Sequence, residues 1–223
     1  MAEMVEVSVS GNQPLTRAEE ILAFWFGTPG VSDTPERRQK LWFGGSDATD
    51  RLIRERFGED VQKAVVGEYD DWAKYGRGSL ALILLLDQFS LNIHRDQPRS
   101  YIQGAMALPF ALKSVQRGYD QFVPIEWRVF FYLPLEHSED VHLQRRSVSL
   151  FERLAIYGRE LGQATGTEPD PGLVARLDSY LDYAKRHALV VERFGRMPYW
   201  NELLGRESTP EEAKWLAQGG PDF

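Results

Sequence analysis

The chain has 223 residues, a formal net charge of −7 and no cysteine. The acidic balance argues against a general nucleic-acid surface, which needs a basic patch, and the lack of cysteine excludes disulfides, thiolate zinc sites and a cysteine nucleophile. Hydrophobic residues make up 43% of the chain, enough for a substantial core. Neither a signal peptide nor a membrane-spanning segment is expected. The composition predicts a soluble, cytoplasmic protein that binds neither nucleic acid nor membrane.

From residue 15 onward the sequence pattern is helical, whereas residues 1–14 are interpreted as a loose N-terminal tail. Capping boxes, prolines at first helical positions and glycines at helix ends mark the boundaries. No strand pattern appears after residue 14, so a single all-α domain of about ten helices is predicted over residues 15–223. The expected helices cover residues 17–26, 35–43, 47–58, 79–91, 99–117, 124–134, 139–161 and 171–194, with short pieces at 59–66 and 69–75 and a last helix from Pro210.

Single residues decide several of these boundaries. Asp47 is expected to cap the third helix, and Gly58 is expected to end it. Pro109 should kink the helix that contains it, and Pro134 should stop the helix before it, because proline lacks the amide that the helical ladder needs.

The most unusual segment is a run of seven apolar residues, 80–86, that leads directly into Asp87 and Gln88. As a helix this run is apolar on every side, so it should lie at the centre of the molecule. It is too short to span a bilayer, which takes about 20 residues. We expect the helices at 139–161 and 171–194 to pack against it.

Asp87 must find a partner if it is drawn into this interior, since a buried carboxylate survives only when it is paired or hydrogen-bonded. We expect an arginine or histidine from the His137 segment or from residues 187–196 within direct or water-bridged reach of it. Closer in sequence, Arg95 could clamp Asp87 at the end of the helix. Alternatively, the side chains of Arg95 and Arg99 could hold an anionic ligand beside Asp87, which would act as a base.

A second polar constellation contains His137, Ser138, Glu139 and His142. Ser138 should cap the following helix, with Glu139 on its positive N-terminus. The spacing Glu139-x-x-His142 is also that of carboxylate-bridged di-iron bundles, but the second motif that such bundles need is missing. A zinc site using His137, His142 and an acid has no further support. No metal site or other cofactor is therefore expected.

A third constellation lies at the end of the 171–194 helix and just after it. His187 is at the edge of the core face of this helix, which is typical of a satisfied core histidine. Arg196 follows Gly195, which breaks the helix, so Arg196 sits at a turn from which it can point inward. Asn201 follows within a few residues.

These motifs form an ordered set that extends over about residues 17–223. The set comprises Leu85-Leu86-Asp87-Gln88-Phe89, Asn92-Ile93, Arg95, Leu133-Pro134, His137-Ser138-Glu139, His187, Arg193-Phe194-Gly195-Arg196, Pro198, Asn201, Leu204-Gly205-Arg206 and Ser208-Thr209. In this order it resembles the bacterial domain of unknown function 924 family. The resemblance implies an all-helical, tetratricopeptide-like fold and brings no established activity.

The chain departs from the family pattern at a few positions. Ser90 and Leu91 stand where the family has Pro-Arg, His94 stands where an aromatic residue is usual, and Tyr199 and Trp200 stand where the family has His-Arg. Two basic positions and one histidine of the pattern are thus absent. The matching positions that could contribute to a ligand site are Asp87, Gln88, Asn92, Arg95, Arg128, His137, Glu139, His187, Arg196 and Asn201.

Two classes of function stay open at this point. One is a protein- or peptide-binding scaffold whose helical stack presents a groove to its partner, an expectation that rests on analogy of fold. The other is an enzyme or small-molecule binder whose interior pocket joins Asp87, Arg95, His137, His187 and Arg196 around an anionic ligand. A groove lined by exposed apolar residues would favour the first class, and convergence of these five side chains would favour the second.

Overall fold

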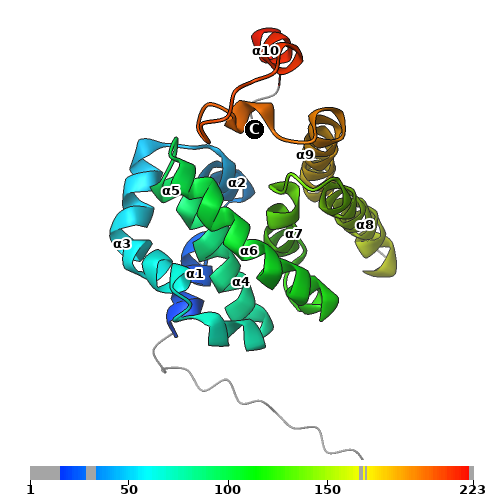
Figure 1. Cartoon of the computed structure of the whole chain (residues 1–223). Coiled ribbons are helices and arrows are strands. Elements are labelled where there is room, and N and C mark those ends of the chain that lie inside the picture. Colours follow the sequence, from blue (N-terminus) through cyan, green and yellow to red (C-terminus); the bar gives the residue numbers. More distant parts are fainter. Residues whose placement is uncertain (1–15, 29–33, 166–167, 169, 221–223) are drawn as a thin grey trace, which may run out of the picture.

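The computed structural model (Figure 1) describes residues 16–28, 34–165, 168 and 170–220. These residues form helices and turns without a strand, which confirms the all-α class. The α-helices are α1 (Arg17–Phe26), α2 (Pro35–Phe43), α3 (Asp47–Val65), α4 (Gly76–Leu84), α5 (Ser90–Ile93), α6 (Pro98–Gln116), α7 (Val129–Glu136), α8 (Val141–Thr165), α9 (Pro171–Phe194) and α10 (Pro210–Ala217). The shorter turns are the 3₁₀ segments η1 (Asp70–Lys74), η3 (Tyr119–Phe122), η4 (Ile125–Arg128) and η5 (Pro198–Trp200), and the π-helical turn η2 (Leu85–Phe89).

The expected tail over residues 1–14 lies outside the described residues. None of the described helices combines the length and the apolar character that crossing a membrane requires. The single domain over residues 15–223 remains a prediction, as does the stacking of its helices in the manner of tetratricopeptide proteins.

The centre of the molecule is one helical rod made of α4, η2 and α5. Every residue from Ser79 to Ser90 in this rod is buried, as the apolar run predicts. α4 packs against α1, α6 and α7, while η2 packs against α3 and α6. Aromatic rings close around the rod: the ring of Phe89 lies 5.3 Å from that of Trp25 and 5.1 Å from that of Phe57. The rod is therefore held by α1 and α3, which precede it in sequence, and by α6, which follows it.

The expected packing of α8 and α9 directly on the central rod is wrong. α8 and α9 pack mainly on each other at one side of the molecule, and α7 lies between this pair and the rod (Figure 1). The reason is the composition of α7, whose eight residues are all buried. A helix that is apolar on every side needs neighbours on every side, so α7 fills the interior position next to the rod.

The third helix is longer than the sequence predicts, and Ser46, rather than Asp47, is its N-cap. The Oγ atom of Ser46 accepts a hydrogen bond from the amide of Thr49. α3 continues through Gly58 to Val65 because its buried face, with Phe57 and Val61 four residues apart, continues across the glycine. Burial of that face outweighs the modest helix-breaking tendency of glycine.

Neither internal proline ends its helix. α6 runs through Pro109 to Gln116. α7 runs through Pro134 to Glu136, and the amide of His137 still donates to the carbonyl oxygen of Leu133 over 2.9 Å. The expected stop at Pro134 is therefore wrong, because the burial of α7 compensates for the one amide that proline lacks. This extension places Glu136 and His137 at the buried end of α7.

A second, smaller core joins the end of α9 to the C-terminal segment. It consists of Val190, Val191, Met197 and Trp200, all buried. Gly195, with φ of 70°, ends α9 in the left-handed conformation and turns the chain back. α10 begins with the predicted capping box, in which Thr209 and Glu212 exchange hydrogen bonds with each other's backbone.

Two glycines, Gly78 in α4 and Gly58 in α3, allow a matched test of how closely η1 packs against α4. A Cβ atom at Gly78 in α4 would lie 2.6 Å from the carbonyl oxygen of Trp72, whereas one at Gly58 in α3 would meet nothing nearer than Arg54 Cγ at 3.9 Å. Gly78→Ala should lower the free energy of unfolding by about 1–3 kcal/mol through overpacking. Gly58→Ala should raise it by about 0.5–1 kcal/mol, because alanine has the better helix propensity. Urea melts measure both, and a stable Gly78→Ala protein would contradict this close approach of η1 to α4.

Candidate functional site

Asp87 lies in the π-helical turn of the central rod, and its side chain is fully shielded from solvent. A π-helical turn is rare and is frequently found at functional sites. Both carboxylate oxygens are paired: Oδ2 accepts a 2.7 Å hydrogen bond from Nε2 of Gln88, and Oδ1 lies 2.8 Å from Nδ1 of His137. The expectation that a histidine from a distant segment reaches Asp87 is confirmed.

His137 stands at the C-terminal end of α7, where the chain leaves the helix. Since its Nδ1 hydrogen points at a carboxylate, the ring is fixed in one orientation and Nε2 is left on the other side. A quarter of the His137 side chain is exposed, so molecules in solution can reach the ring. Burial lowers the pKa of His137, but the charge of Asp87 and its hydrogen bond outweigh this, and the pKa is raised.

Glu136 and His187 extend this cluster into the interior. Both side chains are about 95% buried, and Oε1 of Glu136 lies 3.3 Å from Nδ1 of His187. Nδ1 of His187 also lies 3.0 Å from the carbonyl oxygen of Tyr183, one turn earlier in α9. The rings of His137 and His187 are 6.5 Å apart. The interpretation of His187 as a satisfied core histidine is thus confirmed, and it borders the Asp87–His137 pair.

The ionisation of these two inner groups is decided by burial. Desolvation lowers the pKa of His187 to about 3, although the Tyr183 carbonyl partly opposes this. Desolvation raises the pKa of Glu136 to about 8, although the charge of His137 partly opposes this. Near neutral pH both Glu136 and His187 are therefore uncharged. We refer to Asp87, His137, Glu136 and His187 as the acid–base cluster.

Arg95 and Asn92 do not join this cluster. The guanidinium of Arg95 forms a bidentate ion pair with Asp50 of α3, with bonds of 2.6 and 2.9 Å. The amide nitrogen of Asn92 donates to the carbonyl oxygen of Gln88. An Asp87–Arg95 clamp is therefore wrong, because Arg95 reaches the buried carboxylate of Asp50 instead. This pair fastens α5 to α3.

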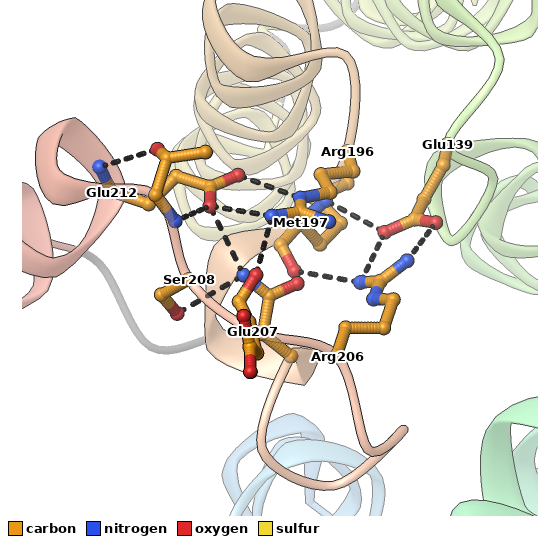
Figure 2. Close-up of polar contacts among 9 residues, drawn as sticks. Glu139, Arg196, Met197, Arg206, Glu207, Ser208 and Glu212 are labelled. Carbon is orange, nitrogen blue, oxygen red and sulfur yellow. Dashed lines mark hydrogen bonds and ion pairs between the residues drawn. The ribbon is translucent and has the colours of Figure 1, made fainter.

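Glu139 belongs to a separate network that holds the C-terminal segment (Figure 2). Its carboxylate accepts hydrogen bonds of 2.7 and 2.9 Å from Arg206 and one of 2.7 Å from the amide of Met197. The expected cap at Ser138 is wrong: Asp140 caps α8, since its Oδ1 accepts from the amides of His142 and Leu143. Glu139 is thereby freed from the helix terminus to bind residues far along the chain.

Arg196 meets Glu212 in the same network (Figure 2). Nε and one terminal nitrogen of Arg196 each bind the Glu212 carboxylate over 2.6 Å. Asn201 joins them, since its Nδ2 lies 3.3 Å from the same carboxylate. The hydrogen bonds from Arg196 hold the pKa of Glu212 at about 2, below its usual value. We call this set, with Glu139 and Arg206, the C-terminal clamp.

Arg128 lies apart from both groups, just before the opposite end of α7 from His137. Its guanidinium stacks 4.7 Å from the ring of Tyr157 and contacts backbone carbonyls of Gln121 and Val123. The ten predicted site residues are thus divided among four places. Asp87, Gln88, His137 and His187 converge, while Asn92 and Arg95 face α3 and Glu139, Arg196 and Asn201 belong to the C-terminal clamp.

The sequence-based list of site residues lacks Glu136, Asp50, Arg206 and Glu212. Glu212 could have been suspected, since the predicted capping box contains it. Glu136 could have been found only by extending α7 past Pro134, which the proline argued against. Arg206 belongs to one of the family motifs, but nothing near Asp50 or Arg206 in sequence identifies their partners, which lie 45 and 67 residues away.

Loss of the Asp87–His137 contact should lower the free energy of unfolding. Asp87→Ala should lower the free energy of unfolding by about 3 kcal/mol, the low end for breaking a buried pair, because His137 keeps some solvent contact. Asp87→Asn should cost less, since it preserves the shape and part of the hydrogen bonding. Equal urea midpoints for wild type and Asp87→Ala would show that the pair does not stabilise the fold.

The clamp should be sensitive to acid. Because the pKa of Glu212 is lowered from 4.5 to about 2, its contribution to stability is complete above pH 4.5 and is lost as the pH falls toward 2. The difference in unfolding free energy between wild type and Glu212→Gln should therefore shrink over this range. Urea melts at several pH values measure the difference, and one that is constant with pH would contradict the Arg196–Glu212 pair.

Comparisons with known proteins agree with this fold. A structure titled as a protein of unknown function from Agrobacterium tumefaciens is 36% identical to this chain, with a TM-score of 0.70 over 91% of this chain and 97% of that one. No curated protein matches the chain. The model of the family described as bacterial protein of unknown function, DUF924, matches residues 21–220. The chain therefore belongs to the DUF924 family of bacterial proteins.

Proposed function

We propose that the protein binds a small molecule at the acid–base cluster and uses His137 to exchange a proton with it. The observation that carries this proposal is the 2.8 Å contact between Nδ1 of His137 and the fully buried carboxylate of Asp87. A histidine oriented by a buried carboxylate on one nitrogen is the arrangement that general acid–base catalysis employs on the other.

The exposure of His137 suits this role. Its ring is anchored from the inside by Asp87, and within the described residues no protein atom hydrogen-bonds Nε2. The raised pKa of His137 favours the protonated ring, so Nε2 carries a hydrogen that it can give to a bound molecule. Proton exchange is most effective when the pKa is close to the working pH.

The arginines of the expected interior pocket are engaged elsewhere. Arg95 is paired with Asp50, and Arg196 is paired with Glu212. Any affinity of the cluster for a negative or electron-rich group therefore depends on the imidazolium of His137. Within the described residues no group of three or more His, Cys, Asp or Glu side chains is arranged to hold a metal ion.

The protein- or peptide-binding function expected from a helical stack stays a prediction, as does its partner. Exposed apolar side chains occur on α8 and α9, among them Ile156 and Leu189, at 46% and 64% exposure. The acid–base cluster is the more specific feature, because burying a titratable group costs solvation free energy, whereas scattered apolar residues on a surface are common.

A thermal-shift screen of small metabolites tests the proposal. A compound present at about 100 times its Kd should raise the melting temperature by roughly 5–10 °C, since it binds only the folded state. His137→Gln should lose this shift. His142→Gln is the matched control, because His142 is exposed and its side chain is not part of the cluster.

The proposal fails if a stabilising compound acts equally on wild type, His137→Gln and His142→Gln. It also fails if the His137→Gln protein, folded by circular dichroism, turns over an identified substrate at the wild-type rate.

A further inference from the structure

We propose that Glu136 is the second hydrogen-bond donor of the site: a neutral carboxylic acid whose Oε2 donates its proton to an oxygen atom of the ligand. This inference rests on the proposed function and adds the chemical class of the ligand. It follows from the position of Glu136, from its contact with His187 and from the charges around it.

Glu136 is the residue directly before His137, and it is buried at the end of α7. Its Oε2 atom is buried and has no hydrogen-bond partner among the described residues. Native proteins rarely leave a buried polar side-chain atom unpaired, and such exceptions call for a functional explanation. Glu136 is also the sequence neighbour of His137, the histidine of the cluster whose side chain is a quarter exposed.

The contact with His187 shows which oxygen carries the proton. Nδ1 of His187 lies 3.0 Å from the carbonyl oxygen of Tyr183, an atom that can only accept, so Nδ1 carries its hydrogen. Oε1 of Glu136, at 3.3 Å from the same nitrogen, therefore faces a positive N–H dipole and is the accepting oxygen. The proton of the neutral acid then resides on Oε2.

The groups around Glu136 favour its neutral form. Asp87 of η2 contributes a negative charge, and His137 of α7 is its positive neighbour, already paired with Asp87. His187 of α9 is uncharged near neutral pH. Tyr199 approaches from the C-terminal segment and brings no positive charge. Burial has the largest effect, and it raises the pKa of Glu136 to about 8.

A ligand held by both Glu136 and His137 meets two hydrogen-bond donors. Protonated His137 offers N–H at Nε2, and neutral Glu136 offers O–H at Oε2. The complementary group is one that only accepts hydrogen bonds, such as a carboxylate or a carbonyl. Ammonium and guanidinium groups, which only donate, are the wrong partners. The structure thus assigns the site to small organic acids or carbonyl compounds.

The test uses acetate, acetamide and methylammonium as probes, with the ring signals of His137 followed by NMR in the full-length protein. Wild type and Glu136→Gln should both bind the first two probes at pH 6, since glutamine also donates. Glu136→Met, which cannot donate, should bind them roughly tenfold more weakly. Above pH 8, wild type should lose more affinity than Glu136→Gln, because only glutamate gives up its donor.

A second measurement does not depend on binding. A group whose folded pKa is raised from 4.5 to about 8 contributes its full stability below pH 4.5 and loses it as the pH rises to about 8. Wild type should therefore lose stability relative to Glu136→Gln across this interval in urea melts.

The outcomes separate the two proposals. If acetate shifts His137 equally in wild type, Glu136→Gln and Glu136→Met, the site exists but Glu136 is not its donor. If methylammonium binds and acetate does not, the ligand class is wrong. If no probe reaches His137 in any variant, both this inference and the proposed site are overturned. A stability difference between wild type and Glu136→Gln that is constant with pH would show that Glu136 is not held neutral.

Discussion

A carboxylate fully removed from solvent is among the costliest groups that a protein interior can hold, and Asp87 is such a group. It lies at the end of an apolar run that must be central because no face of it suits water. The position of α7 depends on this constraint, since α7 has to bring His137 within 2.8 Å of the π-helical turn. The arrangement of the fold around α7 thus serves a polar contact as much as an apolar core.

The charged residues elsewhere are organised as separate pairs. Arg17 binds Asp60, Arg95 binds Asp50, and Arg206 binds Glu139, each joining segments at least 43 residues apart in sequence. Each arginine in these pairs is neutralised by its own acid. The cluster of Asp87, Glu136, His137 and His187 therefore has an electrostatic character decided by two histidines and two acids, without help from guanidinium groups.

Much of the fold was predictable because burial leaves a strong signature in sequence. The all-α class, the central position of residues 79–90 and the capping box at Thr209 follow from patterns that operate within a few residues. Helix ends at Gly58 and Pro134 were wrongly predicted, because local breaking tendencies of about 1–3 kcal/mol are outweighed by the burial of a whole helix face.

The candidate site was predictable to a lesser degree. The need of Asp87 for a distant histidine follows from solvation energy alone, and His137 meets it. The sequence does not tell which residue pairs with which, because the pairing depends on how helices far apart in sequence pack against each other. Arg95 could reach either Asp87 or Asp50, and only the placement of α3 beside α5 decides for Asp50. Glu136 was not predicted as a site residue, because it is buried only when α7 continues past Pro134.

The connection between α7 and α8 has two faces. Glu136 and His137 turn inward to the acid–base cluster, and Glu139, two residues after His137, is fastened to Arg206 and to the amide of Met197 (Figure 2). Only Ser138 separates His137 from Glu139 in sequence. Residues 136–139 therefore join the acid–base cluster to Met197 and Arg206 of the C-terminal segment. The proposed ligand site and the attachment of the C-terminal segment thus share one short stretch of backbone.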